Sequence, residues 1–197
     1  MKTTSPCQPK ERPILFSGQM VRAILDGRKT QTRRNIKPQP QESWAQDASG
    51  PRRSYGWSWR GNRVTSVQVP VGDPYMLSRC PYGLPGDRLW VREMWYESPM
   101  TGGCKYKADG EVIGWRPHPS IHMPRWASRI SLEITGIRCE RLKDISKTDA
   151  KAEGAPAEAT KAREWFASLW ESINGTGSWD ANPWVWAVSF QRVNMGI

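Results

Sequence analysis

The chain has 197 residues, with 29 Lys and Arg against 19 Asp and Glu and a formal net charge of +10. This length fits one domain of ordinary size, and a content of 38% apolar and 10% aromatic residues argues against general disorder. No apolar run approaches the length of a membrane-spanning helix. The first residues also lack the apolar core of a secretory signal, so we expect a cytoplasmic protein.

The positive charge is concentrated in the first third of the chain. Residues 1–60 contain 12 basic and 4 acidic residues, a net charge of +8, whereas the remainder is nearly balanced. A basic segment favours a polyanionic partner, because each Lys or Arg that neutralises a phosphate releases a condensed counterion. A membrane surface fits less well, since these basic residues do not lie along an amphipathic helix. We therefore expect a nucleic acid or nucleotide partner and no membrane, with simple solubility as the alternative.

The four cysteines give no clear metal signature. None forms a CxxC pair, which is the usual spacing of a structural zinc site. An irregular site formed by Cys80, Cys104, His118 and His122 is the alternative. We expect no metal, no other cofactor and reduced thiols.

The N-terminal part predicts a tail, a strand, a helix and a second strand. Residues 1–12 indicate a flexible basic tail, and the apolar run 13–16 indicates a strand. Ser17 is a favourable N-cap for a helix over about 18–26, and the glycine that follows is typical of a helix end. The polar segment 28–34 then predicts a turn that runs into a strand.

A long insertion is predicted at about residues 38–80, where Pro, Gly, Gln, Ser and Arg dominate and regular structure is expected only in a hairpin near Gly61. Trp and Arg are mixed in this segment. Single-stranded nucleic acid is often held by such a mixture, with bases stacked on the rings and phosphates on Arg. On this interpretation Trp57 and Trp59 bind the ligand. The alternative is that the tryptophans anchor the insertion on the rest of the domain.

The remainder predicts mostly strands, followed by two helices and a closing strand. The expected strands cover about 88–96, 104–108, 111–115, 128–142 and 184–193, and the expected helices about 147–154 and 160–174. The second and third strands are expected to pair as a hairpin. The predicted fold class is α+β, a small and mostly antiparallel β-barrel with two or three short helices, as a single domain over residues 13–197.

A Pro- and His-rich loop precedes the strand at 128–142. A loop of this kind at a barrel rim can line a pocket. Its candidate ligand-binding residues are His122, Arg125, Trp126 and Arg129.

The segment Ile24–Arg33, with the sequence ILDGRKTQTR, resembles the opening of the ASCH domain, a relative of the PUA-like β-barrels. The family's pattern here is a short helix, a Gly, a basic residue, Lys, Thr and then a strand. Three further segments agree in order, namely the turn Gly86-Asp87, the helix ending at Glu153 and the strand 184–193. The chain therefore resembles the longer phage- and prophage-encoded members of this family.

The resemblance implies a PUA-like barrel with a basic cleft for an RNA segment or a modified nucleotide or nucleoside, in the cytoplasm of a bacterial host. One compact branch of the family is an amidohydrolase of N4-acetylcytidine, and another has been described as a ribonuclease. Carried over by motif, the catalytic residues are Lys29, Thr32 and Glu153. The neighbours expected to contact the ligand are Arg28, Thr30, Arg33 and Arg34.

Amide hydrolysis by these residues needs a hydroxyl nucleophile and a base that takes its proton. Lys29 acts as that base only if its pKa falls well below the usual value, an effect that nearby arginines favour and Glu153 opposes. In an ideal strand Lys29 and Thr32 face opposite sides. They converge only if Lys29 precedes the strand, and Thr30 is the alternative hydroxyl.

Three functional hypotheses follow from the sequence. The leading one is an ASCH-type protein that binds RNA or a modified nucleotide. The second is a hydrolase that acts on that ligand, and the third is a protein–protein adaptor in phage development or against host defence.

Overall fold

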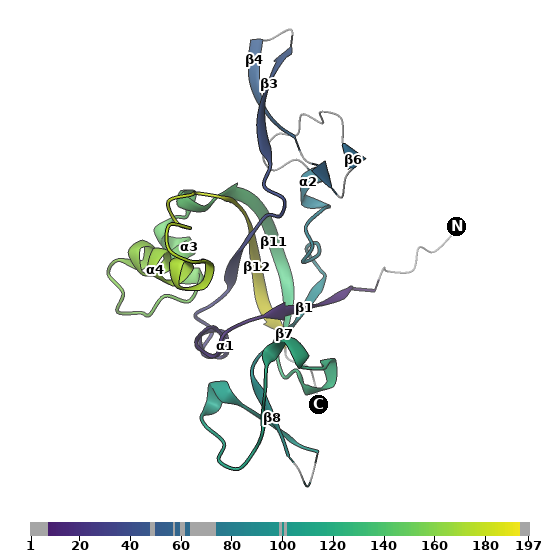
Figure 1. Cartoon of the computed structure of the whole chain (residues 1–197), viewed down its shortest axis with the longest axis vertical. Coiled ribbons are helices and arrows are strands. Elements are labelled where there is room, and N and C mark those ends of the chain that lie inside the picture. The colour runs from purple at the N-terminus through teal and green to yellow at the C-terminus, as the bar shows by residue number, and fades with distance from the viewer. Residues whose placement is uncertain are drawn as a thin grey trace, which may run out of the picture. The chain divides into compact units, whose positions relative to one another are not determined.

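The computed structural model of the chain describes residues 8–47, 50–56, 58–59, 62–63, 74–98, 100 and 102–193. Helices and several sheets are both present, which confirms the α+β class (Figure 1). The chain divides into two compact units, each assembled from separate stretches of sequence. None of the described helices is long and apolar enough to cross a membrane.

The first unit comprises residues 1–27, 82–136 and 190–197. Its strands and helix are β1 (Glu11–Leu15), α1 (Gly18–Leu25), β7 (Arg88–Arg92), β8 (Trp95–Glu97), β9 (Cys104–Tyr106), β10 (Pro117–His118), the start of β11 (Ser131–Arg141) and the end of β12 (Trp184–Val193). Three 3-10 turns accompany them, η1 (Lys107–Asp109), η2 (Ser120–His122) and η3 (Arg125–Ala127). β1 pairs in parallel with β7, and β7 pairs antiparallel with β11. A separate antiparallel sheet has the order β10-β8-β9.

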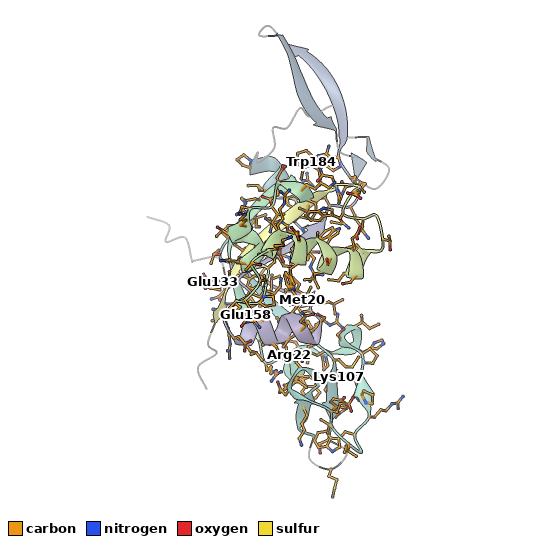
Figure 2. All side chains as sticks on the ribbon, turned by 90° about the vertical axis from the view of Figure 1, so that its left-hand side faces the viewer. Met20, Arg22, Lys107, Glu133, Glu158 and Trp184 are labelled. Atoms are coloured by element: carbon orange, nitrogen blue, oxygen red, sulfur yellow. The ribbon has the colours of Figure 1, made fainter. Side chains whose placement is uncertain are left out.

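Helix α1 begins and ends where the sequence predicts. The Ser17 side chain accepts a hydrogen bond from the Met20 amide at 3.5 Å and so caps the first turn. Gly27 follows the helix with a φ of 73°, a conformation that glycine adopts without strain. On the exposed side of α1, Arg22 donates to the Ala108 carbonyl of η1 at 2.9 Å, next to Lys107 (Figure 2).

The turn before β7 is held by a single carboxylate. Asp87 accepts hydrogen bonds from the Lys10 amide at 3.0 Å, from the Leu84 amide at 3.1 Å and from Arg12 at 2.8 Å. Arg12 therefore lies in β1 rather than in a tail, and β1 begins at Glu11, ahead of the predicted start at residue 13. The turn also needs a glycine at position 83, where φ is 117° and a Cβ would lie 2.6 Å from the Arg12 guanidinium.

The second unit comprises residues 28–81 and 137–189. Its elements are β2 (Gln31–Asn35), β3 (Gln41–Asp47), β4 (Gly50–Gly56), β5 (Ser58–Trp59), β6 (Asn62–Arg63), α2 (Pro74–Leu77), the 3-10 turn η4 (Leu142–Asp144), α3 (Lys147–Ala152), α4 (Ala162–Asn174), the end of β11 and most of β12. The strand order in its main sheet is β11-β12-β2, with β12 antiparallel to β2.

Helices α3 and α4 lie side by side and share a core (Figure 1). Ser146 caps α3 as predicted, because its hydroxyl accepts from the Asp149 amide at 3.0 Å. The predicted stripe of α4 is confirmed at Phe166 and Trp170, which are buried, whereas Ile173 at its end is 55% exposed. The shared core consists of Leu142, Ile145, Ala150, Ala155, Ala162, Phe166, Trp170 and Val185.

The predicted insertion at about 38–80 has more regular structure than the sequence predicts. β3 pairs antiparallel with β4, from Gln41 opposite Gly56 to Asp47 opposite Gly50. β5 pairs with β6 and confirms the expected hairpin near Gly61. The longer hairpin escapes prediction because its strands lack the alternation of apolar and polar residues by which a half-buried strand is recognised.

The strand pairing tests two further expectations. The predicted hairpin of 104–108 with 111–115 is wrong, because β9 pairs with β8 and residues 107–109 form η1. The mostly antiparallel arrangement is confirmed, with β1 and β7 as a parallel exception. Within the described strands no sheet closes on itself, so the α+β class is established and the barrel stays a prediction.

Candidate functional site

Lys29 and Glu153 lie together in the second unit, at the end of α3. Lys29 precedes β2 and forms an isolated antiparallel bridge with Glu153, the C-cap of α3. Its ammonium group donates to the Glu153 carboxylate and to the Glu153 carbonyl, both at 2.8 Å. Two residues that are 124 positions apart in sequence are thus in direct contact.

Local backbone structure fixes this contact. Gly154 has a φ of 100° and turns the chain sharply after α3. The Thr30 amide donates to the Ala152 carbonyl at 2.8 Å, which holds the start of β2 against the helix end. Arg28 adds a hydrogen bond to the Gly154 carbonyl at 3.1 Å.

Arg33 extends the pair into a larger group of charges. Its guanidinium lies 3.2 Å from the second Glu153 oxygen, 2.5 Å from Glu140 and 3.3 Å from Asp149. It also donates to the Gln31 side chain at 2.7 Å. We call Lys29, Arg33, Glu140, Asp149 and Glu153 the buried ion cluster.

Burial decides the electrostatics of Lys29. Its side chain and that of Arg33 have no exposed surface, and that of Glu153 is 2% exposed. Burial lowers the pKa of Lys29, and the charges of Arg34 and Arg33 add to this effect, while Glu153 opposes it without cancelling it. Of the opposing effects expected from the sequence, burial and the nearby arginines therefore outweigh Glu153, and the pKa of Lys29 lies below its usual value.

The two predicted hydroxyl groups lie elsewhere. Thr32 is buried and neighbours Arg33 along β2, opposite Val188 of β12. Because successive residues of a strand face opposite sides, we infer that Thr32 points away from the face on which Arg33 contacts Glu153. Thr30 is exposed. The structure thus brings together Lys29, Glu153 and Arg33, and it places Thr32 on the other face of the strand.

The cluster contains residues that sequence reasoning missed as site residues. Glu140 lies near the end of β11 and Asp149 in the first turn of α3. Asp149 is visible in the sequence only as part of a capping box. Burial raises its pKa, but hydrogen bonding from Ser146 and the charges of Arg33 and Arg138 bring the pKa below the usual value.

The predicted loop residues of the first unit form a separate set of contacts. Arg129 binds Glu93 at 2.9 Å and Asp109 at 2.6 Å, and it stacks on the Tyr106 ring at 3.9 Å. Glu93 is buried, and burial raises its pKa although Arg129 lowers it. Arg125 pairs with Glu11 at 2.8 Å. Both arginines therefore have structural partners in their own unit.

The aromatic candidates lie in different surroundings. Trp126 is 62% exposed and contacts Trp95 edge to face at 5.7 Å. His122 is exposed in η2. Trp59 belongs to β5, and Trp57 lies outside the described residues. In the part of the chain that the structure describes, no group of three or more His, Cys, Asp and Glu side chains is arranged to hold a metal ion.

Comparisons with known proteins give few matches. No protein-family model matches the chain, and no curated protein matches it. The crystal structure of protein EF3133 from Enterococcus faecalis V583, described by the family model DUF984, is similar over 96% of this chain and 82% of its own. The identity is 11% and the TM-score 0.42. A likeness this distant carries no argument about function.

Proposed function

We propose that this chain is an ASCH-type, PUA-like protein that binds RNA or a modified nucleotide at the buried ion cluster. The observation that carries the proposal is the direct contact of Lys29 with Glu153. These are the residues at which the resemblance to the ASCH pattern predicts function. A bacterial cytoplasm and a phage or prophage origin belong to the same proposal.

The physical argument starts from the cost of burying charge. Removing an ion pair from water costs several kcal/mol per ion, and apolar residues of similar size often serve stability equally well. A buried ionic group with a shifted pKa is therefore a candidate functional site. Lys29 is fully buried and its pKa is lowered by that burial, and its partner Glu153 is buried beside it.

The chemistry of the cluster suits a nucleobase. Each oxygen of a carboxylate can accept more than one hydrogen bond, so Glu153 retains capacity beyond its contacts with Lys29 and Arg33. A carboxylate accepts from the N4 group of cytosine. Arg28 is exposed and donates to the Gly154 carbonyl, which follows α3, so it supplies positive charge beside the cluster for a phosphate.

The lowered pKa of Lys29 favours hydrolysis of an N4-acyl group as a second candidate function. A neutral Lys29 amine would take a proton from water as the water oxygen bonds to the acyl carbon. The bond from that carbon to N4 would then break, and the proton would pass to N4, giving a carboxylic acid and cytidine. Water rather than Thr32 would be the nucleophile, because Thr32 faces away from Lys29.

Binding is tested by titrating the protein with N4-acetylcytidine and with a short single-stranded RNA. The variants are Lys29→Met, the exposed Arg28→Ala and the control Lys37→Met, which removes an exposed lysine of the same unit. We expect wild type and Lys37→Met to bind equally. Lys29→Met should bind about tenfold or more weakly, because it removes the charge-assisted hydrogen bond to the Glu153 carboxylate, and such a bond is worth roughly 1.5–3 kcal/mol. Arg28→Ala should weaken RNA binding.

Thermal unfolding shows whether Lys29→Met is folded. Unchanged binding by folded Lys29→Met and by Arg28→Ala would overturn the proposal, and Arg28→Ala keeps the test valid if Lys29→Met fails to fold. Release of cytidine is followed in the same samples by chromatography. Absence of product from concentrated wild-type protein would exclude the amidohydrolase while leaving the binding proposal standing.

A further inference from the structure

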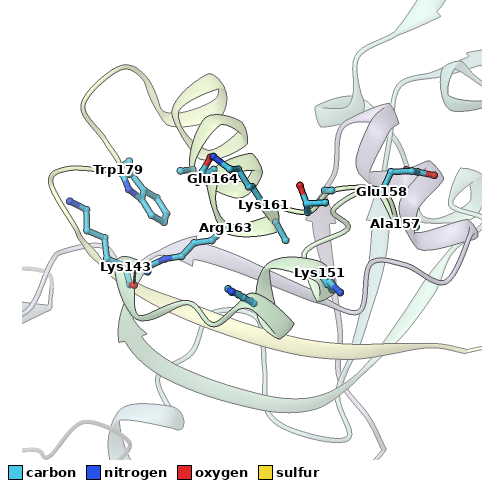
Figure 3. A pocket seen from close by; sticks show the side chains of 13 residues that line it. Lys143, Lys151, Ala157, Glu158, Lys161, Arg163, Glu164 and Trp179 are labelled. Carbon is cyan, nitrogen blue, oxygen red and sulfur yellow. Dashed lines mark hydrogen bonds and ion pairs between the residues drawn. The ribbon is translucent and has the colours of Figure 1, made fainter.

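A hollow of about 840 Å³ lies beside α3 and the first turns of α4 in the second unit (Figure 3). Five basic side chains line it, which are Lys143, Lys147, Lys151, Lys161 and Arg163. Two acidic side chains, Glu158 and Glu164, also line it. We call this surface the basic hollow. Its lining does not include Lys29, Arg33 or Glu153, so it is separate from the buried ion cluster.

Basic side chains outnumber acidic ones around the basic hollow, although two of the lysines are paired. Lys161 pairs with Glu164 at 3.2 Å, both groups being well exposed, and Lys143 pairs with Asp180 at 2.9 Å. Figure 3 shows Lys151, Lys161 and Arg163 around the hollow, with the Glu158 carboxylate pointing away from them. An excess of positive charge therefore surrounds the cavity.

Two lysines on α3 make the strongest case for an anionic occupant. Lys147 and Lys151 are both exposed and lie four residues apart, which places them on the same face of the helix. Like charges at this spacing destabilise a helix by a few tenths of a kcal/mol. An anion between them would turn this repulsion into attraction.

The start of α4 adds to the positive potential. Its first residue, Ala162, and the following Arg163 and Glu164 line the hollow. The N-cap is Lys161, and no side chain among the described residues caps this turn. The positive end of the helix dipole therefore faces the same cavity as the lysines.

An aromatic wall distinguishes the hollow from a simple patch of lysines. Trp179 lines it and is held half-buried by an edge-to-face contact with Phe166 at 6.2 Å. Bases of single-stranded nucleic acid stack on such rings, and basic side chains beside the rings contact the phosphates. The cavity is also larger than a single phosphate requires.

We propose that the basic hollow binds the sugar-phosphate backbone of single-stranded nucleic acid, with successive phosphates on Lys147, Lys151 and Arg163 and a base against Trp179. This site lies outside the proposed ligand site at the buried ion cluster. A nucleoside without phosphates does not need it. The two proposals therefore succeed or fail independently.

The test measures the affinity of the full chain for a fluorescein-labelled single-stranded RNA of about 12 nucleotides over a range of salt concentrations. The site variant is Lys147→Ala/Lys151→Ala. The control is Lys107→Ala/Arg192→Ala, which removes the same charge from exposed positions of the first unit. Trp179→Phe and Trp179→Ala test the stacking separately from the charge.

We expect the site variant to lose about tenfold in affinity at low salt and to reduce the slope of log K against log[salt] by roughly 1.4, since each phosphate contact contributes about 0.7 for single strands. The control should change both quantities far less. Trp179→Ala should weaken binding about tenfold, and Trp179→Phe should restore most of it.

Equal losses in the site variant and the control would reduce the effect to net charge and overturn the proposal. The same holds if the site variant binds RNA like wild type. Inorganic tripolyphosphate serves as a second probe. If it binds to the hollow while RNA does not, the ligand is a small oligophosphate and the assignment to nucleic acid is wrong.

Discussion

Lys29 and Glu153 are joined twice, once through the backbone and once through their side chains. The isolated bridge between them fixes the two main chains, and the Lys29 ammonium then lies 2.8 Å from the Glu153 carboxylate. The side chains of the pair are consequently oriented by backbone structure. Such support is what a preorganised binding or catalytic site requires.

Glu153→Gln is expected to destabilise the protein by about 3–5 kcal/mol, because it leaves the buried Lys29 without an opposite charge. Arg33 loses one of its three carboxylate partners but keeps Glu140 and Asp149. Urea unfolding measures the loss in free energy of unfolding.

The double variant Lys29→Met/Glu153→Gln removes both charges and serves as the comparison. It should recover most of the stability that Glu153→Gln loses, since no uncompensated ammonium remains in the interior. Additive losses from the two substitutions would mean that the pair is not energetically coupled.

Gly83→Ala is expected to cost more stability than Gly86→Ala. Both glycines have positive φ, 117° and 92°, so alanine at either site introduces backbone strain of about 1–3 kcal/mol. Only at Gly83 would the new Cβ also lie within 3 Å of Arg12 and Asp87, which would displace their ion pair. Thermal unfolding of the two variants compares strain alone with strain plus steric conflict, and equal losses would contradict the importance of the ion pair.

The stability that Asp87 provides should disappear in acid. Burial raises the pKa of Asp87, but hydrogen bonds from Lys10, Arg12 and Leu84 bring it below its usual value. The folded state therefore binds this proton less readily than the unfolded state. The stabilisation is complete above the unfolded pKa of about 3.9 and is lost as the pH falls through the lower pKa of the folded state.

Asp87→Asn should accordingly reduce the free energy of unfolding by about 1–3 kcal/mol at neutral pH. The difference from wild type should shrink as the pH falls below about 4. Denaturation curves of both proteins across this range provide the measurement. A difference that does not depend on pH would show that the carboxylate charge is not what holds the turn.

Local signals in the sequence predict much of the secondary structure. Ser17 and Ser146 cap helices where their hydroxyl groups can reach the third amide. The closing strand has the predicted bounds, 184–193. The stripe of α4 is correct at Phe166 because apolar spacing on a helix reports directly which face is buried.

The composition of the buried ion cluster is less accessible from sequence. Glu140 and Asp149 reach Arg33 from β11 and α3, more than a hundred residues along the chain. Local periodicity carries no information about such distant partners. For Thr32, strand alternation and the motif comparison lead to different expectations, because a motif lists residue types without their orientation.

The division of β11 and β12 between two units affects how the chain must fold. Residues 1–27 belong to the same unit as residues 190–197, and the Phe16 ring lies 6.2 Å from that of Phe190. During synthesis, this unit cannot be completed until Phe190 and the residues beside it have emerged from the ribosome. A cut at any single point in the sequence would likewise fail to separate one intact unit from the other. A shortened chain therefore lacks part of at least one unit.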